Sequence, residues 1–312
     1  MSRVHCIILN WRTAEMTLDA TRAAMRAMEG IDGAITIVDN DSQDGSFERM
    51  QAEAADWPGV RVLQSGRNGG YGAGNNFGIR AGLPGGADYV YILNSDAFPA
   101  PDAIRALLDY LETHPDVGLA GSHIHGLDGA PHTTAFRFPS IASEFEGAAC
   151  TGIFSRLLKN SIVAPPLPTS TTRVDWLAGA SVMIRQSVLD QTGLFDETFF
   201  LYFEETDLCR RAAVAGWPTV YVVESRVAHV GSVSTGMKEW KRVPRYWFAS
   251  RRHYFIKNHG RAYAALATLA HWAGLGVFRL KALLQGKKPH TPPYFFRDFV
   301  SYSLTSRSKP ES

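Results

Sequence analysis

The chain has 312 residues, of which 45% are hydrophobic and 20% are charged. This composition excludes a disordered chain, a collagen and a simple coiled coil. The net charge of +2 hides an asymmetry, because residues 1–235 carry 17 Lys and Arg against 27 Asp and Glu, whereas residues 236–312 carry 15 against 3. We therefore expect an acidic body followed by a basic tail.

The cysteines and the N-terminus indicate a compartment. Cys6, Cys150 and Cys209 are widely spaced and odd in number, so they predict neither a disulfide framework nor a paired zinc motif. The N-terminus lacks the charged-then-apolar pattern of a signal peptide and runs directly into a predicted strand. We expect a cytoplasmic protein.

The first half of the chain alternates β-rich runs with amphipathic stretches, a pattern typical of an α/β fold with a doubly wound, mostly parallel sheet flanked by helices. The predicted strands are residues 4–9, 35–39, 60–64, 89–93 and 117–120. The predicted helices between them are residues 14–28, 46–54, 73–81 and 102–113.

The second half is less regular. Residues 133–173 are rich in Pro, Ser and Phe, which predicts a loop or lid. A strand at 181–184 follows, then a loop that enters a helix with an acidic start and an end at Gly216, then a strand at 219–223.

Polar residues follow each of the first four predicted strands. Ligands of doubly wound sheets bind beyond the carboxyl ends of the strands, so these residues predict one cleft. They are Asn10, Asp39, Asn68, Asn94, Ser95 and Asp96. A single residue of this kind is more often a turn or helix-cap residue, and Ser42, Asp44 and Ser46 are also explained as the start of the next helix.

A glycine-rich segment follows the third strand. Gly69 and Gly70 allow a ligand to approach the backbone closely, and Asn75 adds a hydrogen-bonding side chain at a helix start. The spacing matches neither a P-loop nor a dinucleotide fingerprint.

Two further groups of residues could carry chemistry. Asp96 could hold Mg²⁺ or Mn²⁺ while a diphosphate supplies further oxygens, and His229 could add a nitrogen ligand. Glu204 and Glu205 lie between aromatic residues and a predicted helix start, where one of them could be a general base. The alternative is that His229 is structural and that the acidic residues complement the helix dipole.

With these motifs in place, the sequence resembles the family 2 glycosyltransferases of GT-A fold, and within them the bacterial rhamnosyltransferase-like group. Seven segments carry the resemblance, in family order. They are IILNW at 7–11, VDNDSQDGS at 38–46, NGGYGAGNN at 68–76, LNSD at 93–96, WLAGA at 176–180, FEETDL at 203–208 and HVGS at 229–232.

The resemblance implies a role for each segment. Asp39 would hydrogen-bond the pyrimidine of a UDP- or dTDP-sugar, and Asn68 with the glycine loop would line the nucleotide. Asp96 corresponds to the acidic position of the metal motif, with His229 as a later metal contact. Glu205 corresponds to the catalytic base, with Glu204 beside it. The acceptor side would consist of Trp176, Gly179 and Ala180.

The implied activity is the transfer of a sugar to a saccharide acceptor, with inversion at the anomeric carbon, in cell-surface polysaccharide synthesis. The subgroup suggests rhamnose as the sugar. In many such enzymes the acceptor is lipid-linked. The implied cofactor is Mg²⁺ or Mn²⁺. The sequence departs from the family at two positions: Asn94 stands where many members have the first metal-binding Asp, and Glu205 replaces a commoner Asp. The first departure prompts the alternative of a catalytically degenerate module that binds nucleotides or a partner.

The division of the chain follows from its charge. We expect a catalytic domain at 1–235 and a basic, aromatic helical extension at 236–312, in which residues 262–278 are largely apolar but short for a membrane span. Such an extension suits the inner face of an anionic plasma membrane, to which it would bind peripherally. The alternatives are packing on the catalytic domain or on a second subunit, and RNA binding; without an RNA-recognition motif, no nucleic acid is expected.

Overall fold

The computed structural model describes residues 2–231, 242–286 and 292–304. Within these residues, a nine-stranded mixed sheet has the order β3-β2-β1-β4-β10-β6-β11-β5, with β8 paired to β11, and β7 and β9 form a small second sheet. The strands are β1 (Arg3–Asn10), β2 (Asp32–Asp39), β3 (Val60–Gln64), β4 (Tyr89–Asn94), β5 (Ala97–Pro99), β6 (Leu119–His125), β7 (Ala135–Phe136), β8 (Thr172–Val174), β9 (Trp176–Leu177), β10 (Ser181–Arg185) and β11 (Thr219–His229).

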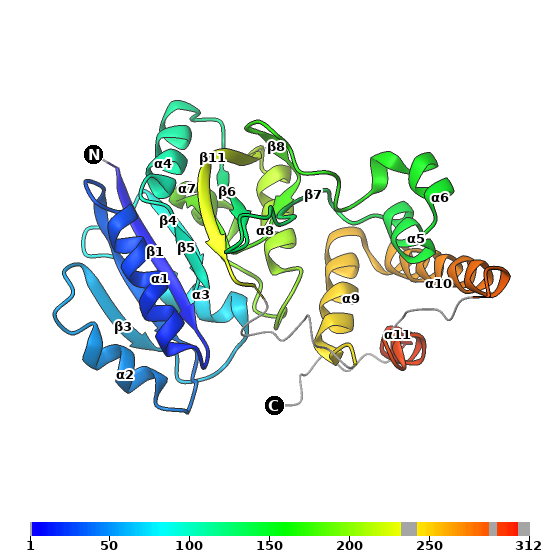
Figure 1. Cartoon of the computed structure of the whole chain (residues 1–312), viewed down its shortest axis with the longest axis horizontal. Coiled ribbons are helices and arrows are strands. Elements are labelled where there is room, and N and C mark those ends of the chain that lie inside the picture. The colour runs from blue at the N-terminus through cyan, green and yellow to red at the C-terminus, as the bar shows by residue number, and fades with distance from the viewer. Residues whose placement is uncertain (1, 232–241, 287–291, 305–312) are drawn as a thin grey trace.

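Helices cover both faces of the large sheet and form a separate group beside it (Figure 1). The helices are α1 (Ala14–Ala27), α2 (Ser46–Glu53), α3 (Tyr71–Ala81), α4 (Ala103–Thr113), α5 (Ile141–Ala149), α6 (Gly152–Leu157), η1 (Lys159–Ser161), α7 (Gln186–Thr192), α8 (Glu204–Val214), α9 (Arg245–His259), α10 (Arg261–Leu284) and α11 (Phe295–Leu304).

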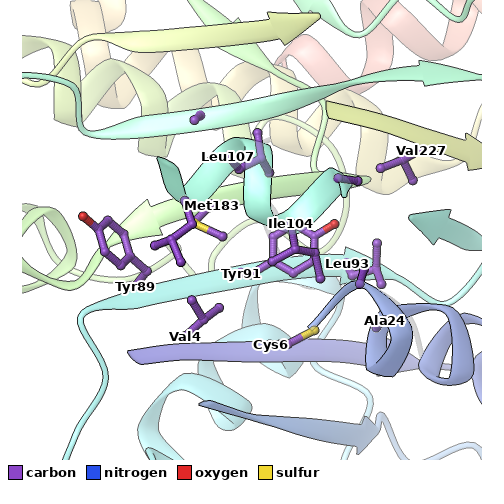
Figure 2. Close-up of a cluster of buried hydrophobic side chains, with 14 of the residues drawn as sticks. Val4, Cys6, Ala24, Tyr89, Tyr91, Leu93, Ile104, Leu107, Met183 and Val227 are labelled. Atoms are coloured by element: carbon purple, nitrogen blue, oxygen red, sulfur yellow. The ribbon is translucent and has the colours of Figure 1, made fainter. Parts of the chain in front are cut away.

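The sheet is buried on both faces because its central strands carry apolar residues on both sides. In β1, Cys6 and Ile8 join the cluster on one face, and Ile7 joins the cluster on the other. Figure 2 shows the first cluster, in which Leu107 of α4 and Tyr91 of β4 are fully buried. Truncation of such a leucine typically costs about 2–5 kcal/mol.

The α/β architecture predicted from the sequence is confirmed, and two strands extend well beyond their predicted C-terminal ends. The strand predicted at 117–120 lies at Leu119–His125, and the strand predicted at 219–223 extends to His229. Their outer halves are polar, and the pairing of β11 with β6 shifts register between Val222 and Arg226. This irregularity interrupts the hydrophobic alternation, so the strands predicted from that alternation end before the strands in the structure do.

The loop or lid predicted at 133–173 is wrong for its central part, which forms α5 and α6. A capping box explains why α5 starts where it does. Ser140 Oγ accepts a hydrogen bond from the Ser143 backbone N–H at 3.1 Å, and Ser143 Oγ accepts one from the Ser140 N–H at 2.7 Å. The prolines around this helix led the sequence analysis to predict a loop instead.

The C-terminal helices pack against the rest of the chain. This is one of the alternatives considered for the basic extension, namely packing on the catalytic domain. Asp207 of α8 is fully buried and accepts hydrogen bonds from Lys257 Nζ at 2.8 Å and from Asn258 Nδ2 at 3.0 Å. α10 lies along α5 (Figure 1). The division expected between residues 235 and 236 falls outside the described residues.

A glycine allows the close approach of α10 to α5. A Cβ at Gly274 would lie 2.5 Å from the Phe145 carbonyl oxygen and 2.8 Å from Ala148 Cβ. Any side chain at Gly274 would therefore force the two helices apart.

Candidate active site

A cavity of about 1050 Å³ lies between the strand ends and the C-terminal helices. Its volume is at the upper end of the range for ligand pockets. It is lined at one end by Asn94, Ser95, Asp96 and His229, along its middle by Gly179 and Glu205, and at the other end by Glu144, Trp247 and His271.

Antiparallel pairing of β5 with the end of β11 brings Asp96 and His229 together. His229 aligns with Ala97, next to Asp96 in the chain. As a result, His229 Nε2 lies 2.9 Å from Asp96 Oδ1, and the Gly231 backbone N–H donates to Asp96 Oδ2 at 3.0 Å. Both side chains are mostly buried. This is the pair that the sequence suggested as metal ligands.

Beneath this end, Asn10 and Asp39 form a closed network. Asn10 Nδ2 donates to Asp39 Oδ1 at 2.7 Å, and Ser42 donates to both carboxylate oxygens of Asp39, through Oγ at 2.6 Å and through its N–H at 3.0 Å. Asn10 and Asp39 are fully buried, and neither lines the cavity. The contact of Asp39 with a pyrimidine stays a prediction, and the residues that cover Asp39 would have to move for it.

The residues that follow this network do reach the cavity. Asn40 Nδ2 donates to Asn68 Oδ1 at 3.0 Å, and the Gly70 N–H donates to the same oxygen at 3.0 Å. Asn40, Asn68 and Gly70 line the cavity, whereas Gly69 and the buried Asn75 do not. The sequence analysis did not single out Asn40, although it stands in the second quoted motif.

Gly70 is required by its surroundings. Its φ of +88° is in the left-handed region, and a Cβ there would lie 1.9 Å from the Phe200 carbonyl oxygen. The Tyr71 N–H donates to that same oxygen at 3.0 Å. The glycine loop is therefore fixed directly to the segment that leads into α8.

That segment places two adjacent carboxylates differently. Tyr202 and Phe203 both have left-handed backbones, with φ of 69° and 72°, an uncommon conformation for residues other than glycine that is often found at functional sites. After this turn, Glu205 lines the cavity and Glu204 is buried beside it, 1% exposed. The sequence could not distinguish the two.

The protonation of these carboxylates is coupled. Burial, together with the charge of Glu205, raises the pKa of Glu204 well above its ordinary value, and neither Glu204 oxygen has a hydrogen-bond partner among the described residues. Burial also raises the pKa of Glu205, although the Gly179 N–H donates to its Oε1 at 3.2 Å. Burial and the proximity of the two carboxylates therefore disfavour two negative charges on this pair.

The middle of the cavity contains the residues assigned to the acceptor. Trp176, Gly179 and Ala180 all line it. Trp176 stacks on Phe136 with ring centroids 4.2 Å apart. A Cβ at Gly179 would lie 2.3 Å from the Tyr71 hydroxyl oxygen and 2.9 Å from Glu205 Oε1, so only glycine fits there.

The far end of the cavity is built by residues that the sequence analysis missed. Glu144 of α5 accepts hydrogen bonds from Arg251 Nη2 at 2.7 Å and from His271 Nδ1 at 2.8 Å. Burial alone would raise the pKa of Glu144, but Arg251 and His271 together lower it. His271 Nε2 is buried and has no hydrogen-bond partner among the described residues. Tyr246 and Trp247 of α9 complete this wall.

Comparison with known proteins shows to which family this chain belongs. Residues 3–255 match the family model described as glycosyltransferase like family 2. The chain belongs to this family. The site residues of this glycosyltransferase, from Asn10 to His229, all lie within the matched range.

Named relatives are similar over parts of the chain. An N-acetylglucosaminyl-diphospho-decaprenol L-rhamnosyltransferase of Mycobacterium tuberculosis is 34% identical over 212 residues, covering 65% of this glycosyltransferase and 68% of the relative. Rhamnosyltransferase WbbL of Escherichia coli is 28% identical over 166 residues, covering 51% and 61%.

A solved structure shares the fold. The mannosyltransferase PcManGT of Pyrobaculum calidifontis, in complex with GDP-Man and Mn²⁺, superposes with a TM-score of 0.57 at 14% identity, covering 98% of this chain and 81% of that one. This likeness supports the GT-A fold of the glycosyltransferase.

The donor set of Asp96 and His229 fits a divalent cation that a substrate completes. Across the described residues, no cluster of three or more His, Cys, Asp and Glu side chains could hold a metal ion by itself. A carboxylate and an imidazole nonetheless face each other on the cavity wall. Diphosphate oxygens could supply the remaining ligands, and Mn²⁺ accepts such a mixed set.

Proposed function

We propose that this glycosyltransferase moves a sugar from a UDP- or dTDP-sugar to a lipid-linked saccharide with inversion at the anomeric carbon, and that rhamnose is the first donor sugar to test. The observation that carries this proposal is the presence of Asp96, His229 and Glu205 on the wall of one cavity. The names of the relatives support the choice of sugar and acceptor.

The donor would occupy the end of the cavity formed by the strand ends. Asn40, Asn68 and Gly70 offer amide and backbone groups to the nucleotide, and Asn94 and Ser95 lie beside the diphosphate. Asp96 and His229 would hold Mg²⁺ or Mn²⁺, which neutralises the negative charge that grows on the leaving diphosphate. Asn10 and Asp39 hold the loop at 40–46 in place from below.

Glu205 would remove the proton of the acceptor hydroxyl as that oxygen attacks the anomeric carbon from the face opposite the diphosphate. The Gly179 N–H orients its carboxylate. The raised pKa of Glu205 makes it a stronger proton acceptor than an exposed glutamate. Burial raises the pKa of Glu204 well above its ordinary value, which disfavours a second negative charge beside the reacting oxygen.

The acceptor would lie along Trp176, Gly179 and Ala180 and extend to the far wall. There, the Nδ1–H of His271 is held by Glu144, which leaves Nε2 as a hydrogen-bond acceptor for a sugar hydroxyl in the neutral ring. The aromatic rings of Tyr246 and Trp247 add apolar surface. His271 is then a positioning residue for the acceptor.

We place the reaction at the cytoplasmic face of the plasma membrane, in the synthesis of a cell-surface polysaccharide. The three free cysteines suit a reducing compartment. Within the described residues, no helix is both long enough and apolar enough to cross a bilayer. We expect peripheral association through the basic C-terminal helices.

A two-part experiment tests this function. A thermal-shift panel of UDP, dTDP, GDP and their sugars with Mg²⁺ or Mn²⁺ should show stabilisation by pyrimidine nucleotides. Mass spectrometry of a lipid-linked acceptor incubated with the stabilising donor should then show one added sugar, with an inverted linkage by NMR. Nucleotide binding without transfer or donor hydrolysis would instead identify a degenerate binding module, and stabilisation by GDP-sugars alone would exclude the pyrimidine donor.

A further inference from the structure

The outer face of α10 is apolar along its whole length. The exposed residues of this helix are two arginines and nine apolar residues. The apolar ones are Ala262, Ala265, Leu266, Leu269, Ala273, Gly276, Leu280, Leu283 and Leu284. At 100° per residue they fall within about 100° of arc, so they form one continuous stripe about 33 Å long. We call these nine residues the α10 stripe.

This arrangement reverses the usual pattern of a surface helix, which presents polar residues to water. Five leucines of the α10 stripe are between 53% and 79% exposed. A contiguous apolar surface of this kind marks an interaction site. The stripe therefore requires a partner that is itself apolar.

The charges around the α10 stripe indicate what the partner is. The two exposed arginines of α10, Arg261 and Arg279, lie on the same flank of the stripe, 18 residues and five helical turns apart. Within the described part of the C-terminal region, residues 242–286 and 292–304, the one acidic residue is Asp298, which is buried and bound by Arg242. An apolar face bordered by cations and free of exposed carboxylates is complementary to an anionic lipid surface.

The neighbouring α6 repeats this pattern. Ile153 and Leu157, one helical turn apart, are each 73% exposed, and Arg156 beside them is also exposed. The Lys281 ammonium group of α10 donates to the carbonyl oxygen of Cys150, just before α6, at 2.8 Å. The start of α6 therefore lies next to α10, and α6 adds exposed apolar and basic residues to this region.

We propose that the α10 stripe is a lipid-docking surface, on which the helix lies flat in the interface of an anionic bilayer. This inference rests on the proposed function for its purpose, because His271 projects from the side of α10 opposite the stripe and lines the acceptor end of the cavity. One helix diameter, about 10 Å, then separates the bilayer surface from the place where a lipid-linked sugar reacts.

Vesicle binding by the full chain tests the docking surface without any sugar substrate, so its result does not depend on the transfer reaction. The wild type should float with vesicles of phosphatidylcholine and phosphatidylglycerol, and less with phosphatidylcholine alone. Replacing three leucines of the stripe (Leu269→Gln, Leu280→Gln and Leu283→Gln together) should lower the partition coefficient at least tenfold. Val214→Gln changes an 81% exposed residue of α8 and should have no effect.

Two further measurements keep the test decisive. Circular dichroism should show that the triple variant is folded, as expected for exposed positions, and with a short-chain water-soluble acceptor its turnover should match that of the wild type. Unchanged vesicle binding by the triple variant would overturn the proposal. So would a wild-type dimer without lipid that the triple substitution converts to monomer, because the stripe would then be a contact between two copies of the chain.

Discussion

The two ends of the cavity are built in different ways. At the end where we propose that the donor binds, the donor end, Asp96, His229, Asn68 and Gly70 follow strands or close turns of one sheet, and their positions are fixed by backbone pairing. At the end where we propose that the acceptor binds, the acceptor end, Glu144 and His271 are 127 residues apart in the chain and come from helices that meet by side-chain packing. The donor end is therefore set by the fold, whereas the acceptor end can vary with the helices that cover it.

The largest expected effect lies where the two ends meet. Glu205→Gln should lower kcat by about 10²- to 10⁴-fold because the amide cannot accept the acceptor proton. Nucleotide affinity, measured by calorimetry, should change less than about twofold. Glu15→Gln, at a glutamate whose side chain is 79% exposed, is the control. A kcat close to that of the wild type would remove Glu205 from the mechanism.

The second largest effect concerns the stability of the helix packing at the acceptor end of the cavity. Gly274→Ala should destabilise the protein by about 1–3 kcal/mol, because its Cβ would meet the Phe145 carbonyl oxygen and Ala148 of α5. Gly276→Ala, two residues along, meets nothing within 4 Å and should stabilise α10 by up to about 1 kcal/mol. Denaturant unfolding measures both. Equal effects of the two substitutions would contradict the close packing of α10 on α5.

A smaller effect should distinguish the two ends of the cavity, because a change at the acceptor end should alter the KM of only one substrate. His271→Asn can keep the hydrogen bond to Glu144 but loses the Nε2 group, so the acceptor KM should rise by about 2- to 12-fold while the donor KM stays constant. His271→Gln, which can return a polar atom near the Nε2 position, should restore part of the affinity. Initial rates over a grid of both substrate concentrations measure this, and a parallel rise in both KM values would refute an acceptor-specific role.

The smallest effects concern pH. The raised pKa of Glu205 predicts that kcat/KM falls, as pH decreases, at a higher pH than the ordinary glutamate pKa of 4.5 would give.

The pKa of Glu204 is also raised in the folded protein. The stability that Glu204 contributes is therefore present below its pKa in the unfolded chain and is lost as pH rises through its pKa in the folded protein. Glu204→Gln should flatten this dependence in thermal unfolding curves between pH 4 and 9; an unchanged dependence would assign Glu204 an ordinary pKa.

The same contrast explains what the sequence could predict. Strand β3 and the start of α1 have the predicted bounds, because apolar alternation and helix periodicity are local signals. The strand-end residues were predicted to meet because parallel strands end at one edge. Whether Asp39 reaches the cavity could not be predicted, since it depends on how Ser42 folds back.

The acceptor end left little local signal. The Ser140 and Ser143 capping box was present in the sequence, but the prolines around it favoured a loop. Tyr246, Trp247 and His271 were interpreted as part of a basic, aromatic tail, because nothing in their spacing shows that α9 packs against α8 and α10 against α5. Long-range packing decides that position.

A crystal structure with UDP or dTDP and Mn²⁺ tests the central claim most directly. The account predicts the diphosphate beside Asp96 and His229, the nucleotide along Asn40 and Asn68, and open space between the diphosphate and Glu205 for the acceptor. Nucleotide bound elsewhere, for example in the surface depression lined by Arg12 and Arg49, with no ligand density beside Asp96, would contradict it.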